Sequence, residues 1–227
     1  MSVIPLAPAP AFRGRIGRDP RSGHYAVPRR YRLHLSPGHD ECLRIAVVHS
    51  LLGLDEVCPV TLLDPGADCA DGGHPALRPL YEASAHHYRG PAVAPVLSDD
   101  WSGRIVSTHA PDIMRDLARH FASTGPELYP CGEDAAIEAV EQLCARAADP
   151  AVLDVLEERL TAHPHVLGER LTAADVEVWV ALTRHETAHP TDRHPALWAH
   201  VRRLSAHPAF ARPLERHLGH RLGSRPI

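Results

Sequence analysis

Hydrophobic and polar residues alternate ahead of the turn Ser36-Pro37-Gly38, and this alternation predicts a strand over Arg32–Ser36. Apolar residues then recur at helical spacing, which predicts a helix over Glu41–Leu52. A strand that breaks sharply and leads into a helix presents backbone N–H groups to solvent, and such N–H groups bind anions. His39 and Cys42 lie at this junction, so they are the first candidates for chemistry.

The pattern of hydrophobic and polar residues over 30–124 predicts a domain that mixes strands and helices. It predicts a strand with an irregular edge at Pro59, a short helix, a hairpin of two strands and a further helix: Val57–Leu62, Ala76–Ala83, Ala94–Leu97 with Arg104–Ser107, and Ala110–Phe121. The resulting order, β-α-β-α-β-β-α, is that of a thioredoxin-like domain. Residues 1–29 are rich in proline and arginine, lack periodicity and are expected to form an extended arm.

Residues 125–227 carry helical periodicity only. The expected helices are Asp134–Ala147, Ala151–Ala162, one that opens at Leu171-Thr-Ala-Ala-Asp175, Ala196–Ser205 and Phe210–Leu218. Thr172 is placed to cap the third of these, with Asp175 three residues further on. The predicted fold class is therefore α/β plus all-α, with an N-terminal thioredoxin-like domain followed by a C-terminal helical bundle.

Several motifs in this arrangement resemble the glutathione transferase superfamily, and most of all its Xi class, the glutathionyl-hydroquinone reductases. The motifs that carry the resemblance are Leu77-Arg-Pro-Leu-Tyr81, Tyr88-Arg-Gly90, Ala94-Pro95-Val96-Leu97, Gly103-Arg-Ile-Val106, Leu128-Tyr-Pro130, Val166-Leu-Gly168 through Asp175, Leu197-Trp198 and Gly223-Ser224. The resemblance implies a cis peptide before Pro95, a glutathione-transferase fold and a homodimer.

The active-site motif departs from that family. Aligned through Ser36 and Arg44, this chain has His39 where the family has its catalytic cysteine, and Cys42 follows three residues later. Imidazole cannot form a mixed disulfide, so the family's reductase mechanism would require Cys42 to act as the nucleophile. That role requires an exposed thiol, whereas a cysteine among the apolar positions of a helix is more often a small residue buried in the core.

The residues that recognise glutathione in the family are also replaced. The family's Glu-Ser pair, which holds the γ-glutamyl group, aligns with His109-Ala110, and Ala94 stands before the expected cis proline. Losing two charge-assisted contacts, each worth roughly 1.5–3 kcal/mol, predicts that glutathione or another small thiol binds only weakly. A family tyrosine associated with the quinone aligns with Arg221.

A further pair of histidines, His185 and His189, is four residues apart and separated by Glu186. The spacing is one residue longer than the His-Glu-x-x-His zinc motif, so the sequence predicts no metal site. Both histidines are instead expected to line the cleft between the domains, where the family binds its acceptor substrate.

Composition narrows the function classes. The net charge is −4, which gives no basic footprint for nucleic acid, and no apolar run reaches the ~20 residues of a membrane span. Five cysteines at irregular spacings indicate a reducing compartment, so the protein is expected to be cytoplasmic.

Three functions follow as hypotheses. The first is an enzyme of secondary metabolism that acts on a hydrophobic, quinone-like or polyketide-like metabolite, with His39 as base or oxyanion donor in an isomerisation, elimination or addition. Arg44, Ala94, Pro95, His109, His185, His189 and Arg221 are the candidate binding residues. The second is a transferase or reductase that uses Cys42 with a small thiol. The third is a non-catalytic binding protein that retains the fold.

Overall fold

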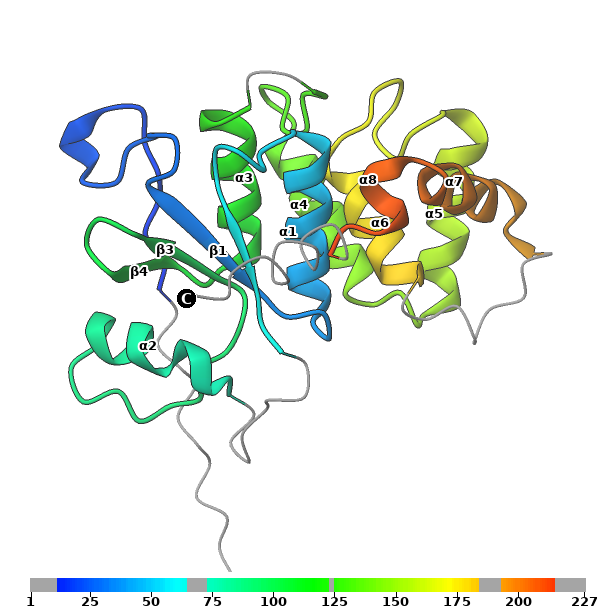
Figure 1. Ribbon diagram of the computed structural model, residues 1–227. Helices are drawn as coiled ribbons and strands as arrows, with labels where there is room; N and C mark the ends of the chain where they lie inside the picture. The colour runs from blue at the N-terminus through cyan, green and yellow to red at the C-terminus, as the bar shows by residue number, and fades with distance from the viewer. Residues whose placement is uncertain (1–11, 65–72, 123–124, 184–192, 215–227) are drawn as a thin grey trace, which may run out of the picture.

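The fold is known from a computed structural model, which describes residues 12–64, 73–122, 125–183 and 193–214. A four-stranded sheet with helices on both faces forms the first part of the chain, and a bundle of helices follows it (Figure 1). The α/β plus all-α class predicted from the sequence is confirmed.

The sheet consists of β1 (Tyr31–Leu35), β2 (Val60–Leu62), β3 (Val96–Asp99) and β4 (Arg104–Ser107) in the order β2-β1-β3-β4. Strand β1 is parallel to β2 and antiparallel to β3, and β3 is antiparallel to β4. Strands β1 and β4 therefore run in the same direction and end at the same edge. The alternation that predicted β1 is reproduced, because Tyr31, Leu33 and Leu35 are buried while the residues between them are partly exposed.

Helices α1 (Asp40–Leu51) and α3 (Ala110–His120) pack together on one face of the sheet, and α2 (Arg78–Ser84) lies on the other (Figure 1). A short 3-10 turn, Pro75–Leu77, leads into α2. Helix α1 also contacts the helical bundle through α6 and α8. This double packing explains why Ile45–His49 is buried without interruption, although an amphipathic helix has only one apolar face.

The bundle contains α4 (Asp134–Cys144), α5 (Pro150–Ala162), α6 (Ala173–Thr183), α7 (Pro195–Ser205) and α8 (Pro208–Ala211). Helix α6 lies at its centre, and every residue from Ala173 to Leu182 is buried. The predicted start of this helix is correct: the Asp175 carboxylate accepts a hydrogen bond from the Thr172 N–H at 2.8 Å.

Several predicted elements differ in extent: β3 spans Val96–Asp99 rather than Ala94–Leu97, and α4 ends at Cys144 rather than at Ala147. Strand β2 begins at Val60 rather than at Val57, because the N–H groups of Val57 and Cys58 both bind the Leu54 carbonyl in a turn. The last predicted helix, Phe210–Leu218, is replaced by α8, which ends ahead of Pro213; residues 215–218 lie outside the described ranges.

The described part of the arm is tied to α3 and β4. Arg13 and Arg15 form ion pairs with Asp112, and Arg15 also pairs with Asp116 at 2.5 Å. The Gly14 N–H donates to the Val106 carbonyl. Residues 12–17 are therefore fixed on the folded body by charge and backbone contacts.

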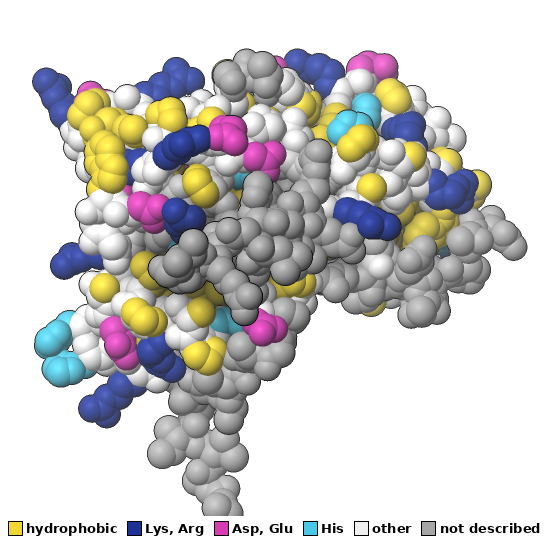
Figure 2. Space-filling model, in the orientation of Figure 1, with side chains coloured by type: hydrophobic (Ala, Val, Ile, Leu, Met, Phe, Trp, Pro, Cys, Tyr) yellow, Lys and Arg dark blue, Asp and Glu magenta, His cyan; other side chains and the backbone are white. Residues whose placement is uncertain are grey.

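On the face seen in Figure 2, acidic and basic side chains are interspersed among the visible atoms. Among the described residues, no helix combines the length and the apolar character that crossing a bilayer requires.

Candidate active site

The candidate active site lies at the edge where β1 and β4 end. Helix α1 begins after β1 and helix α3 begins after β4, so two helix N-termini point to the same edge. The peptide between Ala94 and Pro95 is cis, as the resemblance implied. The pairing of His34 with Val96 places Pro95 beside the end of β1. The topology thus gathers the β1–α1 junction, the cis peptide and the β4–α3 junction.

His39 occupies the N-cap position of α1 with an extended backbone, φ −108° and ψ 128°. Its side chain makes no capping hydrogen bond, so its role is not that of a simple helix cap. The residue is partly exposed, and its ring lies 5.8 Å, centre to centre, from the ring of buried His74. His39 therefore presents an imidazole that is not used in capping, at a helix N-terminus.

Cys42 lies one turn further along α1 and is fully buried. Burial raises the pKa of its thiol to about 12, and a backbone hydrogen bond at Ser36 only partly opposes this. A nucleophilic cysteine needs exposure and a lowered pKa. The hypothesis that Cys42 serves as the nucleophile fails on both counts, because the helix face that carries this residue packs into the core.

Native-state alkylation tests this burial. At pH 8, iodoacetamide is expected to modify exposed Cys131 and to leave Cys42, Cys58 and Cys144 unmodified. A pKa near 12 leaves roughly a thousandfold fewer thiolates than an ordinary cysteine has. Peptide mass spectrometry after alkylation, with a urea-unfolded sample as control, gives the sites. Modification of Cys42 at the rate of Cys131 would contradict its burial.

Arg44, expected at the binding site, is instead bound within the protein. Its Nε lies 2.5 Å from an oxygen of Glu177 on α6, so the pair joins the thioredoxin-like domain to the bundle. Burial raises the pKa of Glu177 to about 7, although Arg44 opposes this rise. The prediction that Arg44 binds a ligand is thus corrected: its guanidinium offsets a buried carboxylate that would otherwise be costly.

His109 occupies the N-cap position of α3, also without a side-chain capping bond. Its Nδ1 lies 2.9 Å from the Asp112 carboxylate. Burial favours the neutral form of Asp112, but Arg15, His109 and Arg13 together hold the pKa of this carboxyl below its usual value. His109 therefore belongs to a charge network at the position where the family has an acidic glutathione ligand.

A cleft of about 320 Å³ opens beside His109, between α3 and α4. It is lined by Arg13, His109, Pro111, Asp112, Arg115, Glu138, Glu141 and Gln142. Burial raises the pKa of Glu141, while His109 and Arg44 oppose that rise. Glu141 was not among the site residues predicted from the sequence; its place on α4 next to the buried positions Ile137, Val140 and Cys144 was the available signal.

The other predicted site residues divide into two groups. Ala94 and Pro95 are buried against the sheet edge and shape it through the cis peptide. His185, His189 and Arg221 lie outside the described residues. These are the three residues that were expected to contact the acceptor substrate, so that prediction falls outside the described part of the chain.

A separate cluster in the bundle joins His165, Asp175 and His200, whose ligand-type atoms lie within 4.8 Å of one another. The guanidinium of Arg203 lies 2.8 Å from Nδ1 of His200. Because arginine only donates, this Nδ1 accepts and the ring proton stays on Nε2, which faces Asp175 at 3.2 Å. In that tautomer His200 has no free nitrogen for a metal, so the contacts are those of a stabilising network around Asp175.

Comparisons with known proteins agree with this architecture. The family model described as "Glutathione S-transferase, C-terminal domain" matches residues 134–203. Glutathionyl-hydroquinone reductase PcpF of Sphingobium chlorophenolicum is 25% identical, over 84% of this chain and 72% of that protein. The chain is thus similar to the glutathione transferase superfamily, and its residues 134–203 match the C-terminal domain of that superfamily.

Solved structures share the fold of this chain. The Xi glutathione transferase of Phanerochaete chrysosporium has a TM-score of 0.74 at 23% identity, covering 89% of this chain and 86% of that one. The glutathione-bound Escherichia coli homologue YqjG has a TM-score of 0.76 at 21% identity, with coverages of 89% and 84%. The chain thus shares its fold with Xi-class glutathione transferases.

Proposed function

We propose that this glutathione transferase relative is an enzyme that acts on a small hydrophobic, quinone-like metabolite through His39 rather than through a thiol. The observation that carries the proposal is the partly exposed His39 side chain, which makes no capping bond at the α1 N-terminus. Burial of Cys42 supports it, because no thiol among the described residues of α1 is accessible.

The chemistry follows from the position of His39. The positive end of α1 favours a neutral imidazole and stabilises negative charge that develops on a substrate oxygen. A neutral imidazole removes a proton next to a carbonyl, or donates its N–H to the forming oxyanion. Isomerisation, elimination or addition are the reaction classes that require only these steps.

A role limited to binding is less well supported. A scaffold that retained only the fold would fill the region between the domains with side chains, whereas the α3–α4 cleft beside His109 has a volume of about 320 Å³. Its carboxylates and His109 offer polar contacts to a substrate. Cytoplasmic location and a homodimer remain predictions; light scattering on the purified chain tests the latter.

The test uses a panel of naphthoquinones, hydroquinones and unsaturated ketones in deuterium oxide, followed by mass spectrometry. The wild-type protein is expected to incorporate deuterium into, or isomerise, at least one member. His39→Ala is expected to lower that rate about a hundredfold. His86→Ala, at an exposed histidine outside the site, is the matched control. Equal rates for wild type and His39→Ala would overturn the proposal.

A further inference from the structure

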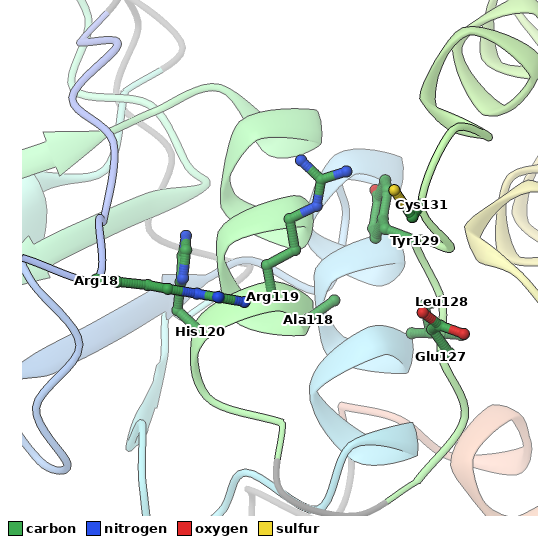
Figure 3. A pocket seen from close by; sticks show the side chains of 8 residues that line it. All are labelled: Arg18, Ala118, Arg119, His120, Glu127, Leu128, Tyr129 and Cys131. Atoms are coloured by element: carbon green, nitrogen blue, oxygen red, sulfur yellow. The ribbon is translucent and has the colours of Figure 1, made fainter.

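A second cavity, of about 570 Å³, lies at the other end of α3 from His109. Figure 3 shows side chains from the arm, from the last turn of α3 and from residues 127–131 around it. The eleven residues of α3 separate the two ends by roughly 16 Å at 1.5 Å per residue. The cavity is therefore distinct from the candidate active site, and its volume is in the range of small-molecule sites.

Basic groups line one wall of this cavity, namely Arg18, Arg119 and His120 (Figure 3). Arg119 is already paired with Asp134 at 2.5 Å, and like His120 it lies in the last turn of α3, where basic side chains offset the negative helix end. Among the residues that the structure describes, Arg18 makes no ion pair. Arg18 is thus the cation in the cavity wall that is available for a ligand.

The carboxylate of the cavity does not neutralise Arg18. Glu127 pairs instead with Arg170, at 3.3 Å. Burial lowers the pKa of His120; Asp116 opposes this, and the positive charges of Arg18, Arg15 and Arg119 lower it further. His120 is therefore neutral at pH 7, in a region of positive potential. Its Nδ1 is enclosed and has no hydrogen-bond partner within the described ranges.

Apolar groups complete the cavity. Ala118, Leu128 and Tyr129 line it, and Leu128 and Tyr129 are almost fully buried. Leu128 and Tyr129 are held in place because the Leu128 carbonyl accepts from the Ala173 N–H at the start of α6, and Arg115 stacks over the Tyr129 ring. Together with the guanidinium of Arg18, this apolar lining suits a ligand with an anionic end and a flat apolar body.

We propose that this cavity binds a small aromatic carboxylate. The guanidinium of Arg18 pairs with the carboxylate, His120 hydrogen-bonds to it, and the ring lies against Leu128 and Tyr129. The ligand class follows from these residues alone, and the site does not depend on the function proposed for His39.

Calorimetric titration with three probes tests the site. Benzoate is expected to bind saturably, while benzamide, its neutral isostere, and inorganic phosphate, which lacks the ring, bind at least about tenfold more weakly. Arg18→Gln should weaken benzoate about tenfold or more, whereas Arg21→Gln, at an exposed arginine of the same arm, should leave it unchanged.

Cys131 provides an independent readout, because it lines the cavity and is exposed. In a Cys69→Ser background, benzoate is expected to slow the alkylation of Cys131 in the wild-type cavity but not in the Arg18→Gln variant. Equal affinity for benzoate and benzamide, equal effects of the two arginine variants, or no saturable benzoate binding would each overturn the proposal. Phosphate binding as tight as that of benzoate would overturn the aromatic class.

Discussion

Replacing Asp175 with alanine is expected to lower the free energy of unfolding by about 3–5 kcal/mol, because it breaks a buried charged network. The Asp175 carboxylate is fully buried and accepts hydrogen bonds from the N–H groups of Val166 and Thr172. It also lies within 3.3 Å of ring nitrogens of His165 and His200. Alanine leaves these donors unpaired at the start of the central helix.

Urea unfolding followed by circular dichroism measures the loss. Asp154→Ala is the matched control, since Asp154 is an exposed aspartate on α5 that also pairs with a histidine, His194. Its effect is expected to be small because surface pairs contribute little. A loss below about 1 kcal/mol for Asp175→Ala would show that the network is dispensable.

The difference in stability between wild type and Asp175→Ala should depend on pH. Burial alone would favour the neutral form of Asp175, but hydrogen bonds from His165, His200 and the backbone hold the pKa of this carboxyl far below its usual value. A carboxyl with a depressed folded-state pKa stabilises the fold above its unfolded pKa of about 3.9, and this contribution is lost as the pH falls further. The stability gap between wild type and Asp175→Ala should therefore be full at pH 7 and shrink below about pH 4.

Sequence patterns predicted the helices and strands well because these elements depend on residues that are near one another along the chain. Alternation gave β1, helical periodicity gave α1 and α3, and the Thr172–Asp175 spacing gave the start of α6. The spacing of residues along the chain also placed His39 at the strand-to-helix junction.

Side-chain environments were predicted less well because they depend on packing between distant segments. The sequence left open whether Cys42 is exposed, and contact of α1 with both α3 and α6 decides that it is buried. Arg44 was expected to bind a ligand. Its partner in the structure, Glu177, lies 133 positions further along the chain, and no local sequence pattern links the two residues. Glu141 was missed since only the docking of α4 beside His109 brings it to the cleft.

Restoring the family's Glu-Ser pair is expected to create glutathione affinity. The double variant His109→Glu with Ala110→Ser would return a carboxylate and a hydroxyl to the α3 N-terminus, where His109 now contacts Asp112. Two charge-assisted contacts of roughly 1.5–3 kcal/mol each predict a gain of about a hundredfold or more. His163→Glu makes the same charge change at an exposed position and should give no gain.

Calorimetry compares these proteins at one pH and salt concentration. A gain for His163→Glu equal to that of the double variant would assign the effect to net charge rather than to the α3 N-terminus. No gain for a folded double variant would show that other residues of the β1–α1 junction, such as Asp40 and Glu41 in the first turn of α1, already exclude the tripeptide.

The central claim is that the edge formed by β1, β4 and the cis Pro95 peptide retains the fold of a glutathione site without its thiol chemistry. Calorimetric titration of the wild-type protein with reduced glutathione tests it most directly. No saturable heat is predicted into the millimolar range, because His109 and Ala110 cannot replace the carboxylate and the hydroxyl of a Glu-Ser pair. A micromolar dissociation constant at this site would contradict the claim.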